Sequence, residues 1–199
     1  MDIAKKHSLL LVDDDRLVLA TLAQGLAVAG YSVSTAESVD DAEATLASGD
    51  RPDLVILDVS IVGRSGLELA ERLRSLDHIP FILLTAYSDH EIVEQAAACG
   101  ALGYLVKPVD TPQLMPAIKA ALARGAELRG LRVSEQQLQN ALGNERDISI
   151  AIGITMVQYR LGRKAAFELL RKTARSQRRK LAELAIDVIK ASETLNLGA

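Results

Sequence analysis

The sequence has little of what disulfide-bonded, thiolate-metal or membrane-spanning proteins require. Cys99 is the only cysteine among 199 residues, which excludes an internal disulfide and any site built from several thiolates. The longest stretch without charge, 17–36, is interrupted by glycine and hydroxyl residues, so we expect a helix, a turn and a strand there. The four apolar residues before the first acidic cluster are too few for the core of a secretion signal. We therefore expect a cytoplasmic protein without membrane contact.

The two parts of the chain have net charges of opposite sign. Residues 1–134 contain 12 Lys and Arg against 19 Asp and Glu, a net charge of −7, whereas residues 135–199 contain 11 against 7, a net charge of +4. From Arg160 to Lys180 there are nine basic side chains and one acidic side chain, Glu168. This division indicates two modules, the second with an anionic partner, and a solvated helical face is the alternative.

In the first 125 residues, short apolar runs rich in β-branched residues alternate with longer helical patterns. The runs lie at 9–12, 31–35, 54–57, 81–84 and 103–106. Helical spacing follows at about 18–29, 40–47, 66–76, 89–98 and 111–124. Five strands that alternate with five helices predict an α/β fold with a parallel sheet covered on both faces. Ligands of such folds bind at the carboxyl ends of the strands.

Polar side chains stand at these strand ends. They are Asp13, Asp14 and Asp15 after the first run, Asp58 after the third, Thr85 after the fourth and Lys107 after the fifth. Crowded carboxylates resist ionisation unless a cation lies among them, and oxygen ligands favour Mg²⁺. A hydroxyl and an ammonium opposite would complement an anion, so the set describes a site where Asp58 accepts a phosphoryl group. Asp15 is also placed to cap the first helix.

The motifs LLLVDDD, PDLVILD, LLTAY and GYLVKP give the first 125 residues a resemblance to a two-component receiver domain. The resemblance implies a flavodoxin-like, doubly wound sheet, phosphorylation of Asp58 by a sensor histidine kinase and a cis peptide bond before Pro108. It implies a magnesium ion held by Asp13, Asp14, Asp58 and the backbone carbonyl of Ser60. It also implies a set of switch and phosphate-contacting groups, namely the Thr85 hydroxyl, the Ala86 backbone N–H, the Tyr104 ring and the Lys107 ammonium. One departure is Val62, where the family usually has proline, and it leaves the rigidity of that loop open.

The pattern from residue 111 to 142 predicts a helix. Glycines lie at 125 and 130 within it and at 143 directly after it. Leu128, Leu131, Leu138 and Leu142 follow a 3-4 spacing, but the same stripe includes Glu135 and Glu145 and spans barely two heptads. A short dimerising coiled coil and a plain connector are both consistent with this pattern.

The segment 148–156 alternates isoleucine with small residues, which by local pattern predicts a strand. However, residues 135–195 resemble an ANTAR domain, a three-helix RNA-binding module of antitermination regulators, and this resemblance predicts a helix instead. The matching residues are Ala141, Leu142, Arg146, Ile148, Ala151, Gly153, Ile154 and Met156, then Ala166, Phe167, Leu170, Arg171 and Ala174, then Leu181, Ala185 and Ile189. We divide the chain into a receiver at 1–125, a helical linker at 126–142 and a three-helix all-α domain at 143–199.

The second module departs from the ANTAR pattern at a few positions. Ile152 and Thr155 replace a common lysine and a common leucine, and Arg163 and Lys164 replace a start of helix that is usually acidic. Basic residues oppose the dipole at a helix N-terminus, so either this end faces phosphates or the two residues are a tolerated cost at the surface. Few aromatic residues are present, so recognition should depend on charge, and RNA binding should weaken steeply with salt. The candidate contacts are Arg163, Lys164, Arg171, Lys172, Arg175, Arg178, Arg179 and Lys180.

Together these resemblances imply a response regulator in which phosphorylation of Asp58 controls binding to RNA hairpins in nascent transcripts. Antitermination and a homodimer are expected, since one protomer would contact each hairpin. A DNA-binding regulator with a helix-turn-helix is an alternative, as is an adaptor whose basic helices bind a protein. We do not expect an output enzyme, because residues 135–199 contain no histidine or cysteine and no convincing pair of acid–base carboxylates.

Overall fold

The computed structural model describes residues 6–49, 51–86, 94 and 98–196. The chain forms two compact units, Met1–Arg129 and Gly130–Ala199, and each is described by itself.

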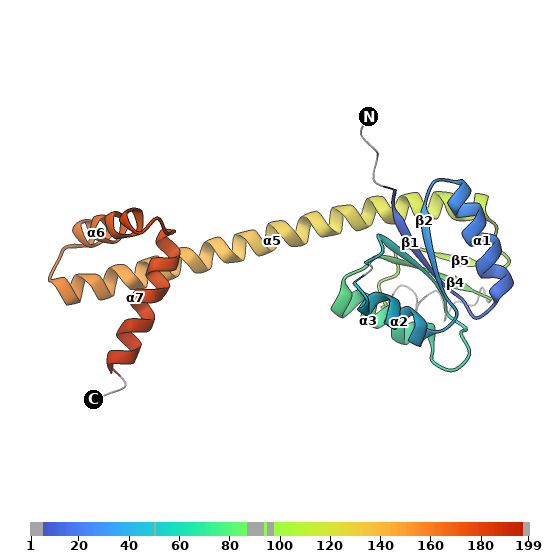
Figure 1. Cartoon of the computed structure of the whole chain (residues 1–199), viewed down its shortest axis with the longest axis horizontal. Coiled ribbons are helices and arrows are strands. Elements are labelled where there is room, and N and C mark those ends of the chain that lie inside the picture. The colour runs from blue at the N-terminus through green and yellow to red at the C-terminus, as the bar shows by residue number, and fades with distance from the viewer. Residues whose placement is uncertain (1–5, 50, 87–93, 95–97, 197–199) are drawn as a thin grey trace. The chain divides into compact units, whose positions relative to one another are not determined.

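The first unit contains a five-stranded parallel sheet (Figure 1). Its strands are β1 (Ser8–Val12), β2 (Ser32–Ala36), β3 (Leu54–Asp58), β4 (Phe81–Thr85) and β5 (Tyr104–Val106). The strand order is β2-β1-β3-β4-β5, and every neighbouring pair is parallel. The chain places β2 on one side of β1 and then places β3, β4 and β5 on the other side. This is the doubly wound topology that the sequence predicts.

Helices cover both faces of this sheet because successive strand residues point to opposite sides. On one face Leu10, Val55 and Leu57 pack with residues of α2 (Val39–Ala47) and α3 (Gly66–Arg72). On the other face Leu9 and Ile56 pack with residues of α1 (Arg16–Val28) and of the first turns of α5 (Thr111–Tyr159). The helix expected at 89–98 falls almost wholly outside the described residues.

The helix expected at 66–76 has a more complex end than the pattern predicts. After α3 the backbone continues as a π-helix, η1 (Leu73–Asp77), and the left-handed conformation of His78 (φ 53°) ends it. Leu73 lies in the core, whereas Leu76, in the same turn, is 74% exposed.

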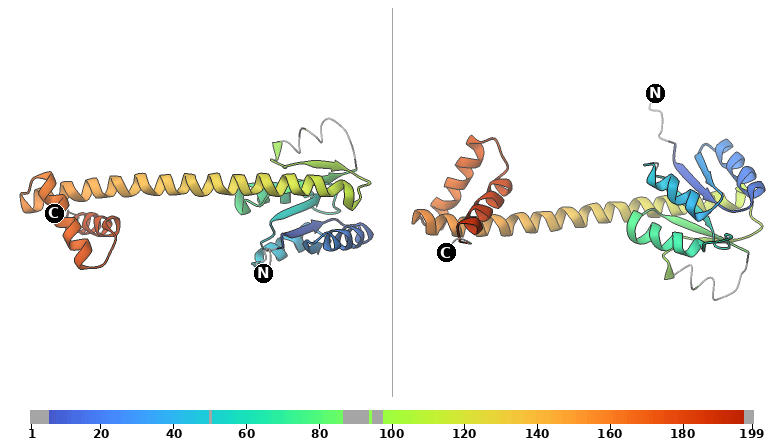
Figure 2. Two further views of the ribbon diagram at one scale, coloured as in Figure 1. Left: turned by 90° about the horizontal axis from the view of Figure 1, so that it is seen from above. Right: turned by 60° about the horizontal axis from the view of Figure 1, so that its bottom comes forward.

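The second unit consists of the later part of α5, together with α6 (Arg163–Ser176) and α7 (Leu181–Asn196). Its core includes Ala151, Ile152, Ala166, Leu170 and Ala185. Figure 2 shows α6 and α7 beside the C-terminal part of α5. Residues 148–156 are helical, so the prediction from the resemblance is confirmed and the strand predicted by local alternation is wrong. The alternation fails as a guide because helical packing buries residues 151, 152 and 155 together.

Helix α5 runs without interruption from Thr111 to Tyr159. The glycines at 125, 130 and 143 do not break it, and the expected linker at 126–142 lies inside it. Leu131, Leu138 and Leu142 are each about 60% exposed on this helix. Among the described residues, no helix combines the length and the apolar character that a membrane span requires.

Candidate functional site

The carboxyl ends of four strands bring the predicted polar residues to one edge of the sheet. Asp13 follows β1 directly, and Asp58 and Thr85 are the last residues of β3 and β4. Because Val12 is in register with Leu57, the next residues, Asp13 and Asp58, lie on neighbouring strands. Both carboxylates are buried, as is the hydroxyl of Thr85.

Three carboxylates and one ammonium meet at this edge. One oxygen each of Asp13, Asp14 and Asp58 lies within 4.8 Å of the others. The Lys107 Nζ lies 2.6 Å from Asp13 Oδ2 and 2.6 Å from Asp58 Oδ2. A single ammonium cannot balance three carboxylates, so the cluster retains negative charge when all four groups are ionised.

The donor set fits a hard divalent cation. In the described part of the chain, the buried Asp13 Oδ2 has no hydrogen bond of normal geometry, although it lies within ion-pair distance of Lys107. A buried carboxylate oxygen without a hydrogen bond is costly, and coordination to a cation would remove that cost. Carboxylate oxygens are the ligands that Mg²⁺ prefers. Asp13, Asp14 and Asp58 therefore could hold this ion.

Burial and charge act against each other in this cluster. Burial raises the pKa of Asp13 above its ordinary value, although Lys107 opposes this shift. Burial would lower the pKa of Lys107, but the carboxylates of Asp13 and Asp58 beside it outweigh that effect and raise the pKa. Lys107 is therefore held in its charged form beside the carboxylate of Asp58.

Backbone amides fix the other oxygens of the two buried carboxylates. The N–H of Asp15 donates to Asp13 Oδ1 at 3.0 Å, and the N–H of Ser60 donates to Asp58 Oδ1 at 3.0 Å. Each Oδ2 is thereby directed at Lys107. The carboxylate of Asp15 instead accepts from the first amides of α1, which confirms its predicted role as a helix cap.

The loop between β3 and α3 is attached to the cluster by a contact that the sequence did not reveal. The backbone N–H of Val62 donates to Asp14 Oδ2 at 3.1 Å. Proline, the usual family residue at this position, has no N–H to donate. The departure at Val62 therefore adds a hydrogen bond to a predicted metal ligand.

Arg64 holds the same loop against two helices. Its guanidinium is 2.9 Å from Asp40 and from Glu43 on α2, and 3.2 Å from Glu68 on α3. No sequence motif indicates these contacts, because they join residues more than 20 positions apart as well as near neighbours. They connect the loop that lacks the usual proline to both helices.

Gly66 allows α3 to start close to Asp58. A Cβ atom at this position would lie 2.1 Å from the backbone oxygen of Asp58, closer than real contacts allow. Only glycine therefore fits without displacing the strand end that carries Asp58.

The predicted switch residues lie on the neighbouring strands. The N–H of Lys107 donates to the backbone oxygen of Thr85 at 2.8 Å, which joins β4 to the segment after β5. The bond between Lys107 and Pro108 is cis, as the resemblance implied. Ala86 is exposed directly after Thr85, and Tyr104 is 45% exposed at the start of β5. Ser60, the predicted source of a carbonyl ligand, is exposed shortly after Asp58.

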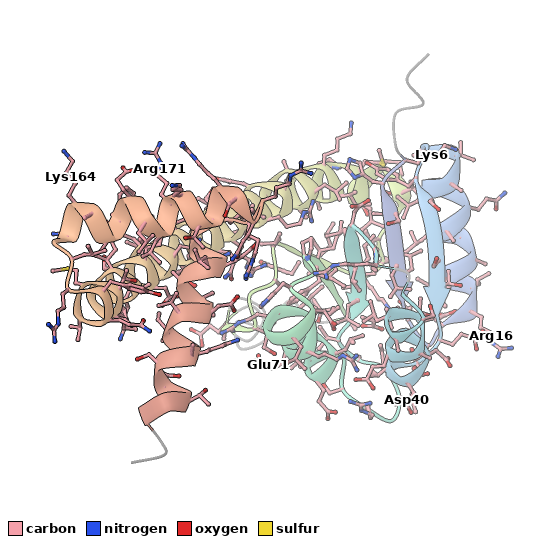
Figure 3. The ribbon with its side chains drawn as sticks, turned by 60° about the vertical axis from the view of Figure 1, so that its left-hand side comes forward. Lys6, Arg16, Asp40, Glu71, Lys164 and Arg171 are labelled. Carbon is pink, nitrogen blue, oxygen red and sulfur yellow. The ribbon has the colours of Figure 1, made fainter. Side chains whose placement is uncertain are left out.

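The predicted RNA contacts form a cationic region on α6 and the turn that follows it. All eight side chains belong to exposed residues, and Figure 3 shows Lys164 and Arg171 projecting from α6. Arg171 pairs with Glu168 at 3.3 Å, and Arg179 pairs with Asp187 at 2.5 Å. The other six have no ion pair within the described residues. They are Arg163, Lys164, Lys172, Arg175, Arg178 and Lys180.

The fold and the acidic edge with its lysine are those of a response-regulator receiver domain. In comparison with known families, the model of the response regulator receiver domain matches residues 9–119, and that of the ANTAR domain matches residues 136–189. The chain belongs to the two-component response regulators and has an RNA-binding ANTAR domain as its output.

Individual relatives agree with this assignment. The chain is 31% identical over 192 residues to the transcriptional regulatory protein PdtaR of Mycobacterium tuberculosis, which covers 94% of this chain and 93% of PdtaR. Among solved structures, the chemotaxis response regulator CheY4 of Vibrio cholerae has a TM-score of 0.54 and 29% identity, covering 58% of this chain and 98% of CheY4. A putative response regulator from Chloroflexus aurantiacus has a TM-score of 0.56 and 35% identity, covering 60% of this chain and 99% of that one.

Proposed function

We propose that Asp58 accepts a phosphoryl group from a sensor histidine kinase and that this modification controls RNA binding by the ANTAR domain. The observation that carries the proposal is the buried Asp58 carboxylate, 2.6 Å from the Lys107 ammonium, in a chain with an RNA-binding output. The RNA would be a hairpin pair in a nascent transcript, and its capture would prevent a terminator from forming.

The chemistry of phosphorylation is a direct transfer. A carboxylate oxygen of Asp58 attacks the phosphorus of a phosphohistidine, and the new O–P bond forms as the P–N bond breaks. The imidazole nitrogen leaves with the bonding electron pair. Lys107 then lies beside the added phosphoryl oxygens and compensates for their charge.

Asp13, Asp14, Asp58 and the Ser60 carbonyl would hold Mg²⁺ in this site. When bound, this ion supplies electrostatic stabilisation of the negative charge on the phosphoryl oxygens. The chain's own task is to hold the carboxylates together, and the amides of Asp15, Ser60 and Val62 do so through the hydrogen bonds described above.

Switching would follow from a shift between two populated arrangements of the receiver. The Thr85 hydroxyl and the Ala86 N–H would bind the phosphoryl group, and Tyr104 would change its orientation on the neighbouring strand. Because α5 is one helix from Thr111 to Tyr159, it belongs to both units and provides a continuous element between them.

The output would be a regulatory dimer without catalytic activity, acting in the cytoplasm. Leu131, Leu138 and Leu142 are exposed on α5 at the spacing of a short coiled coil. A second copy of the chain would cover them, so that each protomer meets one hairpin.

A gel-shift titration tests this function. The chain, with and without acetyl phosphate and Mg²⁺, is titrated against tandem-hairpin RNA and duplex DNA of equal charge. We expect tighter binding to the RNA that improves on phosphorylation, and no improvement for Asp58→Asn. Equal, salt-sensitive binding to RNA and DNA would favour a nonspecific basic surface, and preference for the duplex would favour a DNA-binding regulator. Phosphate labelling that persists in Asp58→Asn would contradict the assignment of the acceptor.

A further inference from the structure

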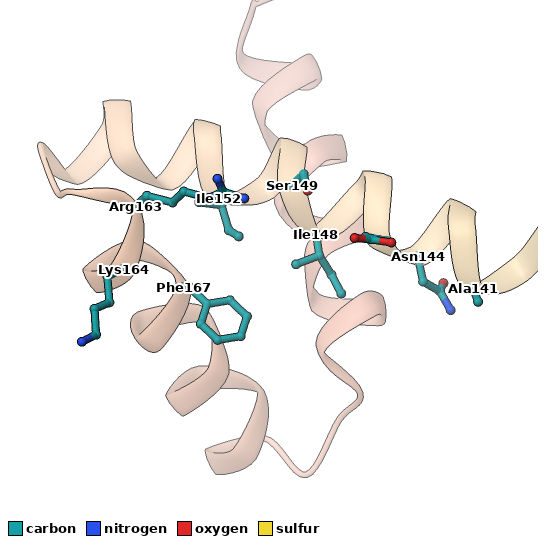
Figure 4. Close-up of a pocket in the computed structure, with 9 residues that line it drawn as sticks. Ala141, Asn144, Ile148, Ser149, Ile152, Arg163, Lys164 and Phe167 are labelled. Atoms are coloured by element: carbon teal, nitrogen blue, oxygen red, sulfur yellow. The ribbon is translucent and has the colours of Figure 1, made fainter.

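A groove of about 670 Å³ lies within the second unit, between α5 and the first turn of α6. Ile148, Ile152 and Phe167 give it an apolar interior, whereas Glu145, Arg163 and Lys164 supply charged groups. Figure 4 shows the Phe167 ring and the Ile148 side chain extending toward the space between the two helices. The size lies within the range of pockets that bind small organic groups.

The charged groups of this groove are available to a ligand. Within the described residues, Glu145, Arg163 and Lys164 take part in no ion pair. Gly162 precedes α6 as its N-cap and offers no side chain, so no side-chain hydrogen bond caps the first turn. Two cations therefore stand at a helix end whose backbone amides also favour an anion.

Apolar walls beside anion-binding groups match the two halves of a nucleotide. An unpaired base is a flat, largely apolar ring system with hydrogen-bonding edges, and proteins bind such bases by stacking them on aromatic side chains. The phosphate of the same nucleotide requires cations or backbone amides. Phe167 is only partly buried, so one side of the groove presents an aromatic group that a base can reach.

We propose that this groove receives one unpaired nucleotide of the bound RNA, with its base against Phe167 and its phosphate at Arg163 and Lys164. The inference rests on the proposed RNA-binding function and deepens it by assigning a specificity site. The carboxylate of Glu145, which only accepts hydrogen bonds when ionised, favours a base with an amino group on its edge, such as cytosine, over uracil.

The groove also explains why several departures from the ANTAR pattern occur together. Ile152 lies on α5 and Arg163 and Lys164 lie on α6, and all three line the same groove. Ile152 is 7% exposed and forms part of the core, so it leaves the positive charge of the groove to α6. The chemistry of this site is thus specific to the present combination of residues, and it should set the RNA preference of this chain.

A coupling experiment between protein and RNA tests the proposal. The full chain, treated with acetyl phosphate and Mg²⁺, first selects a hairpin RNA from a pool with a randomised loop. Each loop nucleotide of the selected RNA is then replaced in turn by an abasic one, and Kd is measured for the wild type and for Phe167→Leu. We expect one position where base removal weakens wild-type binding about tenfold and weakens Phe167→Leu binding little further, since stacking on the ring is lost in both cases.

Lys172→Gln provides a matched control on the same helix. Lys172 is exposed and does not line the groove, so this change should weaken binding to intact and abasic RNAs equally. Arg163→Gln combined with Lys164→Gln should weaken binding more than Lys172→Gln and reduce the preference for the selected loop.

Phe167 also contacts the core, so a second variant guards against loss of folding. Ser149 is exposed at the groove, and Ser149→Trp would fill the space without removing a core side chain. We expect it to abolish the sensitivity to the abasic position while thermal unfolding remains unchanged. If base removal weakens the binding of Phe167→Leu and of Ser149→Trp as much as it weakens wild-type binding, the groove assignment is overturned. Failure of the wild-type chain to select any RNA would instead overturn the proposed function itself.

Discussion

Asp14 illustrates how a single backbone amide can matter at the phosphoacceptor site. Its carboxylate accepts from the N–H of Val62 at 3.1 Å, and this donor exists because Val62 is not proline. The acidic motif predicts that Asp14 is a metal ligand, but no motif predicts what orients it. The contact depends on the path of the loop, which the sequence does not specify.

Val62→Pro removes this donor and should weaken Mg²⁺ binding. A hydrogen bond to a charged group contributes roughly 1.5–3 kcal/mol, so we expect an increase in Kd for Mg²⁺ of about tenfold and slower labelling by acetyl phosphate. Isothermal titration with Mg²⁺ measures the first effect without requiring phosphorylation. The matched control is Val62→Ala, because the side chain is 83% exposed and alanine keeps the N–H. Equal affinities of the two variants would show that the amide does not position Asp14.

Gly66→Ala should displace the backbone of Asp58. The added Cβ would meet the Asp58 backbone oxygen at 2.1 Å, and the backbone must shift to relieve this contact. We expect a loss of about 2 kcal/mol in the free energy of unfolding, a typical cost of overpacking, together with slower phosphorylation. Chemical denaturation and labelling measure the two effects. In the control Gly130→Ala, the added Cβ meets no atom within 4 Å, so the receiver should be unaffected. A fully stable Gly66→Ala would refute the steric argument.

At the scale of elements, the strands of the receiver are easier to predict from local pattern than the helical segment 148–156. Short apolar runs between turn residues fix the positions of β1 to β5 to within one residue. The signal is strongest for β1, β3 and β4, because a strand buried on both faces tolerates few polar side chains. The segment 148–156 has the same local character but is helical, because its partners are α6 and α7 and not a sheet. Local pattern does not distinguish a buried strand from this helical segment. The match of residues over the whole ANTAR domain does distinguish them. The π-turn of η1 had no sequence signal at all.

The contact between α2 and α3 should make stability depend on pH. Glu43 accepts hydrogen bonds from Arg64 and Arg72, and these hold its pKa below the ordinary value of 4.5. A carboxyl group whose pKa is lowered by folding stabilises the protein above the pKa of the unfolded state. That contribution is lost as the pH falls below about 4.5 through the lower folded value.

Glu43→Gln should remove this dependence. We expect the variant to be less stable than the wild type at pH 7 by about 1 kcal/mol or less, since the groups are partly exposed. The difference should vanish under acidic conditions, where Glu43 is protonated in both states. Thermal unfolding of both proteins from pH 3 to pH 7 measures it, and comparison of the two curves removes the contributions of other carboxylates. A constant difference across the range would mean that Glu43 acts through packing and not through charge.

At the scale of the whole chain, the receiver is acidic and the ANTAR domain is basic. In the proposed function, the acidic residues of the receiver hold a cation and accept a phosphoryl group, whereas the basic residues after Arg160 bind RNA. This division could be predicted from composition alone, because net charge depends on residue counts and not on the fold. Composition does not predict which basic side chains are free to bind RNA, because ion pairs such as the one between Arg179 and Asp187 form only in the folded chain.

Unpaired and paired arginines should affect the salt dependence of RNA binding differently. Each cation that neutralises a phosphate releases counterions, and the slope of log Kobs against log salt becomes shallower by roughly 0.7 to 0.9 for each phosphate that is no longer neutralised. Arg175 has no ion pair in the described part of the chain, whereas Arg179 is paired with Asp187 at 2.5 Å. We expect Arg175→Gln to reduce the slope by nearly this full amount and Arg179→Gln to reduce it less, because Asp187 already neutralises part of that charge.

Filter-binding titrations of hairpin RNA between about 50 and 200 mM salt measure these slopes, since binding through several phosphates changes strongly over this range. Asp187→Asn is the reciprocal test: freeing Arg179 should make the slope steeper in an otherwise wild-type chain. If both arginine variants and Asp187→Asn keep the wild-type slope, the turn after α6 does not contact the phosphates, and the RNA must bind through the groove and the first turns of α6.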